Sequence, residues 1–177
     1  MHLLLALLLA LAPQKPAASA LKPLPVVTVD ALQTMMPQAD GWTRGAFVSD
    51  VVRVSDDIGY SFTGADFTRG AAKVHLTIGD TIGAGDCLLA LAGMISVLPE
   101  GYAETPAPST AIMRFTYEGF QAASKWNAEK FSGEFSVLVA GRFVVKAEGE
   151  GVESLDTLRA FVAKIDFKKL ADLKSAK

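Results

Sequence analysis

Cysteine is almost absent from this chain of 177 residues, since Cys87 is the single one. One cysteine cannot form an internal disulfide, so the fold must be stabilised without one, even in an oxidising compartment. The chain also lacks a basic block of the kind that nucleic acids or anionic membranes require, because its 17 basic and 19 acidic residues are interspersed. We therefore expect no nucleic-acid partner.

Long apolar runs are absent except at the start, where every residue from Leu3 to Ala12 is Leu or Ala. A helix of this length rises only about 15 Å, half the thickness of the bilayer core, and cannot form a stable span. The triplet Ala18-Ser19-Ala20 follows, which is typical of a signal-peptidase site. We interpret residues 1–20 as a signal peptide cleaved near Ala20. The alternative is an N-terminal buried helix.

The expected location follows from this leader and from what the remaining chain lacks. No later segment approaches 18 continuous apolar residues, so we expect no membrane span after cleavage. Cys87 lies far from the cleavage site, which excludes a lipid anchor at a cysteine directly after that site. We expect a soluble exported protein, periplasmic or secreted, and a leader this short without disulfides favours a bacterial periplasm.

The remaining chain is long enough for one core. Residues 21–29 are rich in proline and are interpreted as a linker, and residues 30–177 are predicted to form a single α+β domain. Alternating apolar and polar residues predict strands over most of it. The predicted strands are Ala46–Val54, Ile58–Thr68, Ala72–Ile78, Ala111–Tyr117, Phe120–Trp126, Glu134–Val139 and Arg142–Glu148.

Apolar residues at helical spacing predict four helices. These are Ala31–Met36 with Asp30 as N-cap, Gly83–Leu98, Leu155–Lys164 and Phe167–Leu173. The fold class is therefore α+β, a twisted antiparallel sheet with amphipathic helices packed on one face. Each half of the chain has strands followed by a helix, which leaves open whether the two halves are similar.

The segment from Asp80 to Asp86 reads Asp-Thr-Ile-Gly-Ala-Gly-Asp and resembles the C-terminal signature of ribokinase-like sugar kinases. The resemblance implies that the amides of Gly83 to Gly85 bind phosphate and that Asp86 is the base. It covers seven residues, and that family has an α/β fold about twice as large. We therefore favour a local role, in which the glycines turn the chain and Asp86 supports the start of a helix.

Other groups that carry chemistry are sparse. His75 is the only histidine after the leader and has no ligand at metal-binding spacing, so we predict no metal, no cofactor and no catalytic residue. No Gly-x-Ser-x-Gly elbow is present, and Ser61, Ser132 and Ser136 fall in ordinary strand or turn positions. A Ser-His-Asp arrangement stays possible, because its members need not be close in sequence. Cys87 falls on an apolar helical face, which favours packing over nucleophilic chemistry.

Aromatic residues near the predicted turns give the candidate ligand-binding residues. Their expected place is a groove between the sheet and a helix, with core packing as the alternative. The candidates are Tyr60, Phe62, Tyr117, Phe120 and Trp126.

Three functions remain in competition at this stage. The first is an exported, non-catalytic binding or accessory domain with a protein partner or a small apolar ligand. The second is an exported hydrolase, or least favoured a phosphotransferase at Asp80–Asp86. The third is a subunit that pairs through an exposed strand edge, either Ala46–Val54 or Arg142–Glu148.

Overall fold

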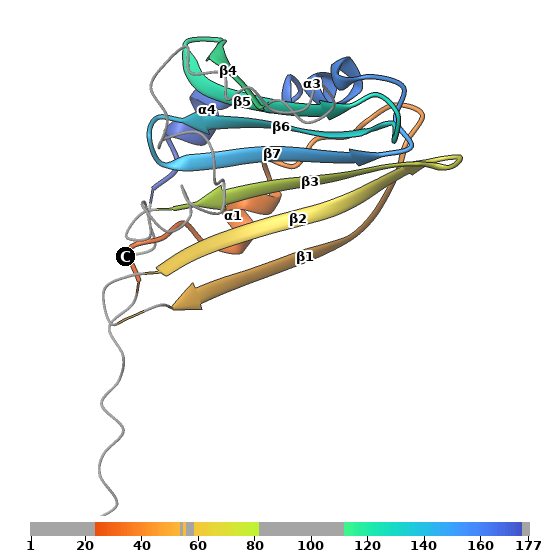
Figure 1. The fold of residues 1–177 in the computed structure, drawn as a ribbon. Coiled ribbons are helices and arrows are strands. Elements are labelled where there is room, and N and C mark those ends of the chain that lie inside the picture. Colours follow the sequence, from red (N-terminus) through yellow and green to blue (C-terminus); the bar gives the residue numbers. More distant parts are fainter. Residues whose placement is uncertain (1–23, 54, 56–58, 82–111, 175–177) are drawn as a thin grey trace, which may run out of the picture.

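A computed structural model describes residues 24–53, 55, 59–81 and 112–174. Within them, one antiparallel open sheet of seven strands has the order β1-β2-β3-β7-β6-β5-β4 (Figure 1). The strands are β1 (Thr43–Arg53), β2 (Gly59–Arg69), β3 (Ala72–Asp80), β4 (Ile112–Tyr117), β5 (Phe120–Asn127), β6 (Ser132–Val139) and β7 (Phe143–Glu150). Short helices pack on this sheet: α1 (Val29–Gln33), α3 (Leu155–Val162) and α4 (Phe167–Ala171).

The predicted strands are confirmed, and the fold consists mostly of β-strands. Two meanders, β1 to β3 and β4 to β7, join into one sheet because β3 pairs antiparallel with β7. There is no evidence of two similar halves. The predicted helix Gly83–Leu98 and the leader, residues 1–20, lie outside the described residues. Of the two strands considered as exposed edges, β1 lies at an edge of the sheet and β7 lies inside it.

The first helix begins earlier than the sequence predicts. Thr28, not Asp30, is the N-cap of α1, and its hydroxyl accepts a hydrogen bond from the Ala31 amide at 3.3 Å. A threonine oxygen satisfies an amide of the first turn as well as an aspartate does, so the predicted cap was misplaced by two residues.

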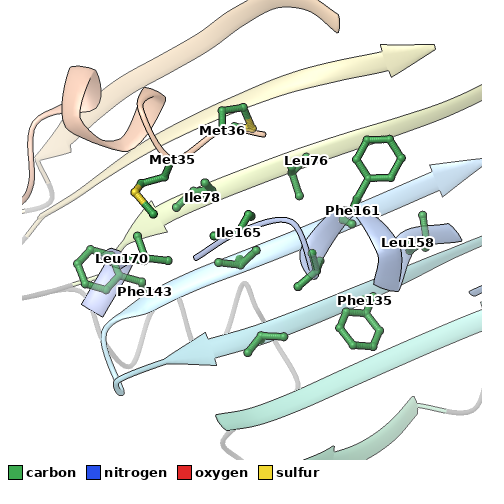
Figure 2. Packing of buried hydrophobic residues seen from close by; sticks show 14 of the residues in the cluster. Met35, Met36, Leu76, Ile78, Phe135, Phe143, Leu158, Phe161, Ile165 and Leu170 are labelled. Atoms are coloured by element: carbon green, nitrogen blue, oxygen red, sulfur yellow. The ribbon is translucent and has the colours of Figure 1, made fainter. Parts of the chain in front are cut away.

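The helices cover one face of the sheet. In the described part, α1 contacts β1 and β2, α3 contacts β6 and β7, and α4 contacts β6. Figure 2 shows the core that results, in which Leu158 and Phe161 of α3 lie over Leu76 of β3 and Phe135 of β6. Trp42 closes this core near Phe161, with the ring centroids 5.1 Å apart in an edge-on arrangement. The opposite face of the sheet is not covered by the described helices and carries the candidate site.

The segment before α1 is tied to the end of β3. Leu24, Val26 and Val27 are buried, and the Val27 amide donates a hydrogen bond of 2.6 Å to Oδ2 of Asp80. Arg142 donates to both carboxylate oxygens of Asp80, from Nε at 2.9 Å and from Nη2 at 2.7 Å. The described part of the proline-rich segment, from Leu24 onward, is thus packed against the sheet.

Among the helices that the structure describes, none is both long and apolar enough to cross a membrane.

Candidate functional site on the open face of the sheet

Polar side chains gather on the face of the sheet that the helices leave uncovered. Strand β3 shows the alternation most clearly, because Val74, Leu76 and Ile78 are buried while Lys73, His75 and Thr77 are partly or fully exposed. The register carries this face across five neighbouring strands. One set of successive register partners, which we name the charged row, consists of Asp66, His75, Glu148, Glu134 and Lys125.

A hollow of about 510 Å³ lies over this part of the sheet. Its lining combines members of the charged row with the next set of register partners toward the β2–β3 and β5–β6 hairpins. The charged side chains around it include Lys73, Lys125, Lys130, Glu134, Glu148 and Glu150. The hollow is therefore bordered by both signs of charge.

Asp66 organises one side of the charged row. Its Oδ2 lies 2.9 Å from Nζ of Lys73, and its Oδ1 lies 2.7 Å from Nδ1 of His75. The hydrogen bond from Lys73, and after it the one from His75, holds the pKa of the Asp66 carboxyl below its ordinary value. The same contact with Asp66 raises the pKa of Lys73. Asp66 therefore stays ionised and fixes the orientation of both neighbours.

The far side of the imidazole is shaped by a glycine. A Cβ placed on Gly64 would lie 3.0 Å from Nε2 of His75 and 3.3 Å from Oγ1 of Thr77. The missing side chain therefore leaves room for the ring beside Gly64. A nucleophilic triad would need a hydroxyl hydrogen-bonded to Nε2. The hydrogen bonds found in the described residues give His75 its bond to Asp66 and none to a hydroxyl.

The charges on the other side of the charged row are only partly paired. Glu134 has Glu148 opposite it on one side and Lys125 on the other. Glu148 is paired with Lys146 at 2.8 Å. Within the described chain, Lys125, Lys130 and Glu134 form no ion pair. Like charges directly opposite each other destabilise a sheet, so a cationic group between Glu134 and Glu148 would be favourable.

The aromatic candidates from the sequence divide between the two faces of the sheet. Tyr117, Phe120 and Trp126 pack against the hydrophobic core, and the rings of Tyr117 and Phe120 both meet Phe167 of α4. Tyr60 and Phe62 lie on the open face, with ring centroids 6.2 Å apart. The five residues therefore do not meet in one groove.

The remaining candidates have local roles or lie outside the described residues. Ser61 is buried and donates its hydroxyl to the Val27 carbonyl at 2.6 Å. Ser136 is buried on β6, and Ser132 borders the hollow. Asp80, the first residue of the kinase-like segment, is held by Arg142 and Val27. Asp86 and Cys87 are not among the described residues.

The sequence did not predict that the five residues of the charged row lie side by side. The alternation put Lys73 and His75 on one face of the predicted strand Ala72–Ile78. The last predicted strand ended at Glu148, whereas β7 continues to Glu150. The signal that was available is the shared period of two, which puts Glu134 and Glu148 on one face of their strands. The sequence does not show that β3 is the neighbour of β7, and this pairing is what assembles the row.

Among the described residues, no group of three or more histidine, cysteine, aspartate or glutamate side chains has the geometry to hold a metal ion. The chain matches no protein-family model, no curated protein and no solved structure.

Proposed function

We propose that this protein is an exported, non-catalytic binding domain, and that it binds a small polar ligand in the hollow on the open face of the sheet. The observation that carries the proposal is the hollow itself, about 510 Å³ in volume and bordered by charges of both signs. Sites for small molecules have volumes of about 300–1,000 Å³, so the hollow has an appropriate size. The ligand that fits it best carries both a cationic and an anionic group.

The side chains around the hollow support this ligand class. The carboxylates of Glu134 and Glu148 suit a cation, and the ammonium groups of Lys125 and Lys130 suit an anion. The sequence favoured a protein partner or a small apolar ligand, and its aromatic residues were the candidates for contacting that ligand. Because Tyr117, Phe120 and Trp126 pack against the core, we propose a polar ligand instead.

Export is part of the proposal and rests on the sequence. The apolar run Leu3–Ala12 and the triplet ending at Ala20 are the features of a cleaved leader. A periplasmic or extracellular binding domain would meet small solutes directly.

A second candidate is an exported hydrolase with His75 as the general base. The contact that favours it is the 2.7 Å hydrogen bond between Nδ1 of His75 and the Asp66 carboxylate, which orients the imidazole as the aspartate of a catalytic triad orients its histidine. Any hydrolytic activity should then disappear in His75→Gln and persist in Glu134→Gln. The binding proposal instead requires that Glu134→Gln weakens ligand binding, because a polar ligand contacts Glu134 directly.

Native mass spectrometry of the chain purified under mild conditions from its own host tests the binding proposal. We expect a small molecule to stay bound to the wild type and to be lost in Glu134→Gln and Lys125→Met. Removing a charged hydrogen-bond partner weakens binding by roughly tenfold or more. Glu153→Gln, an exposed change away from the hollow, is the matched control. A bare wild-type chain would contradict the proposal.

A further inference from the structure

A second row of residues on the open face is apolar. Phe62, Gly79, Val144 and Leu138 are successive register partners on β2, β3, β7 and β6, and we name them the apolar row. Their positions alternate with buried residues of the covered face, such as Ile78 and Val145. Tyr60 extends the apolar row on β2, beside Phe62. Phe62, Val144 and Leu138 are each half-buried, so part of every side chain remains open to solvent.

Gly79 leaves free space in the middle of the apolar row. A Cβ at this position would meet only the Ser61 carbonyl oxygen at 3.5 Å and Cβ of Phe62 at 3.8 Å, which are ordinary contacts. At Gly79 the backbone of β3 is therefore not covered by a side chain of its own. A ligand bound here would contact this backbone and the side chains of Phe62 and Val144 on the two neighbouring strands.

The apolar row and the charged row lie on one continuous surface. Phe62 and Asp66 are four residues apart on β2, and Val144 and Glu148 are four apart on β7. At a rise of about 3.3 Å per residue, the two rows are about 13 Å apart along the strands. The register partners between them on these four strands are Gly64, Thr77, Lys146 and Ser136. The same face thus offers a charged hollow and, one short chain length away, an apolar strip.

The small width of the apolar row argues against a protein as its occupant. It crosses four strands, and the next register partner on β5 is the polar, exposed residue Gln121. Three apolar side chains and Tyr60 provide far less than the ~800 Å² per partner that a stable protein interface needs. A single hydrocarbon chain requires much less contact.

We propose that the ligand of the open face is a single-chain amphiphile with a zwitterionic head, whose head lies in the hollow and whose hydrocarbon chain extends along the strands and ends on the apolar row. This inference rests on the proposed function and adds the apolar half of the ligand. Glu134 and Glu148 receive the ammonium group of the head, Lys125 and Lys130 receive its anionic group, and Phe62 and Val144 contact the chain.

Titration calorimetry on the mature chain tests the proposal with defined probes. These are lysophosphatidylethanolamine with a chain of eight or twelve carbons, below the concentration at which it forms micelles, and glycerophosphoethanolamine, which has the same head without the chain. Each methylene that is buried strengthens binding about fourfold. We expect the head to bind weakly and the twelve-carbon probe to bind at least tenfold more tightly than the eight-carbon probe.

Variants on the two rows separate the roles of head and chain. Val144→Thr should weaken the twelve-carbon probe several-fold and leave the affinity for the bare head unchanged, since only the chain contacts this residue. Glu134→Gln should weaken both. Val48→Thr is the matched control, because Val48 is 62% exposed on the same face and lies outside the apolar row. Urea unfolding of each variant verifies that it is folded.

The outcomes distinguish this inference from the proposed function. If glycerophosphoethanolamine and the twelve-carbon probe bind with equal affinity, the amphiphile proposal is overturned and the proposal of a polar ligand still stands. The same result follows if residues 82–111 or a protein partner occupies the apolar row. Chain-dependent binding that Val144→Thr does not alter places the chain elsewhere and also overturns the inference. Failure of every probe, together with a bare chain in native mass spectrometry, contradicts both proposals.

Discussion

We expect the substitution of Arg142 to lower the free energy of unfolding strongly. Arg142 makes two hydrogen bonds to Asp80, whose side chain is fully buried. We predict that Arg142→Met lowers the free energy of unfolding by about 3–5 kcal/mol, because it leaves a buried carboxylate without its cation. Urea denaturation followed by circular dichroism measures this change.

The exposed pair Asp156–Arg159 is the matched control for that prediction. Its atoms lie 2.8 Å apart, but the side chains are 78% and 45% exposed. Asp156→Asn should lower the free energy of unfolding by less than about 1 kcal/mol. An equal effect of Arg142→Met and Asp156→Asn would show that the Asp80 pair does not hold the N-terminal segment as described.

Asp66 should give the protein a measurable acid dependence. Its pKa is lowered below 3.8 in the folded state, so its contribution to stability is present above that pH and is lost as the pH falls through the lowered pKa. The pKa of Lys73 is raised above 10.5, so the contribution of Lys73 is lost only at more alkaline pH.

Asp66→Asn tests this dependence by urea midpoints measured from pH 2 to pH 7. The variant should be slightly less stable than the wild type at pH 7, and the two should converge as the pH falls from 3.8 through the lowered pKa of Asp66. Asp40→Asn, which removes an exposed carboxyl outside this pair, is measured beside it as the control. A constant gap between Asp66→Asn and wild type at every pH would contradict the account.

The sequence predicted the position of some residues in the sheet but not of others, for a physical reason. Hydrophobicity alone cannot say whether an aromatic residue packs in a core or faces a ligand, so Tyr117 and Phe62 looked alike although they lie on opposite faces. His75 was placed correctly on a polar face, because the alternation in β3 is local. Its partner Asp66 was not identified, since that contact depends on the register between β2 and β3.

At the scale of elements, the close docking of α3 depends on a glycine of β7. A Cβ on Gly149 would lie 2.6 Å from Cδ2 of Leu158 and 2.8 Å from Cγ2 of Val152. We predict that Gly149→Ala destabilises the fold by about 1–3 kcal/mol through overpacking. Thermal unfolding of the purified variant measures the loss.

A double substitution shows whether the loss arises at this contact. Leu158→Ala removes the side chain that the new methyl group would strike, so Gly149→Ala should be less destabilising in the Leu158→Ala background than in the wild type. Strictly additive effects of the two changes would place the strain elsewhere.

The strands were the most predictable elements, because each carries its own period of two and is bounded by turn residues. Ala140 and Gly141, which the sequence suggests as a two-residue turn, both have positive φ, 53° and 63°. Val139 pairs with Phe143, however, so the loop between β6 and β7 has three residues and includes Arg142. Helix boundaries were harder, as the early start of α1 at Val29 shows. A cap can be made by any nearby hydroxyl or carboxylate, and several compete before α1.

For the whole molecule, the order of the strands was beyond local reasoning. Residues far apart in sequence, such as Leu76 and Ala147, become neighbours only when β3 pairs with β7. That single pairing merges two meanders into one sheet and assembles the charged row. The predicted α+β class was therefore right about an antiparallel sheet with helices packed on it, and in the described residues the fold is mostly β with short helices.

The proposed leader gives a prediction for the intact chain. Expressed from Met1 in an exporting bacterium, the protein should be recovered outside the cytoplasm with a mass that lacks residues 1–20, because peptidase cleaves after Ala20. Intact-mass spectrometry of the periplasmic fraction measures this. A chain that keeps Met1–Ala20 in the cytoplasm would contradict the export proposal.

The central claim is that the open face of the sheet is the binding face. The most direct measurement is a ¹⁵N–¹H correlation spectrum of the mature chain, recorded while the co-purified small molecule is added. We predict that the amide signals that move belong to β3, β7, β6 and β5, centred on His75, Glu134 and Glu148. Shifts confined to the helix-covered side, around Leu158 and Leu170, or no shifts at all, would contradict it.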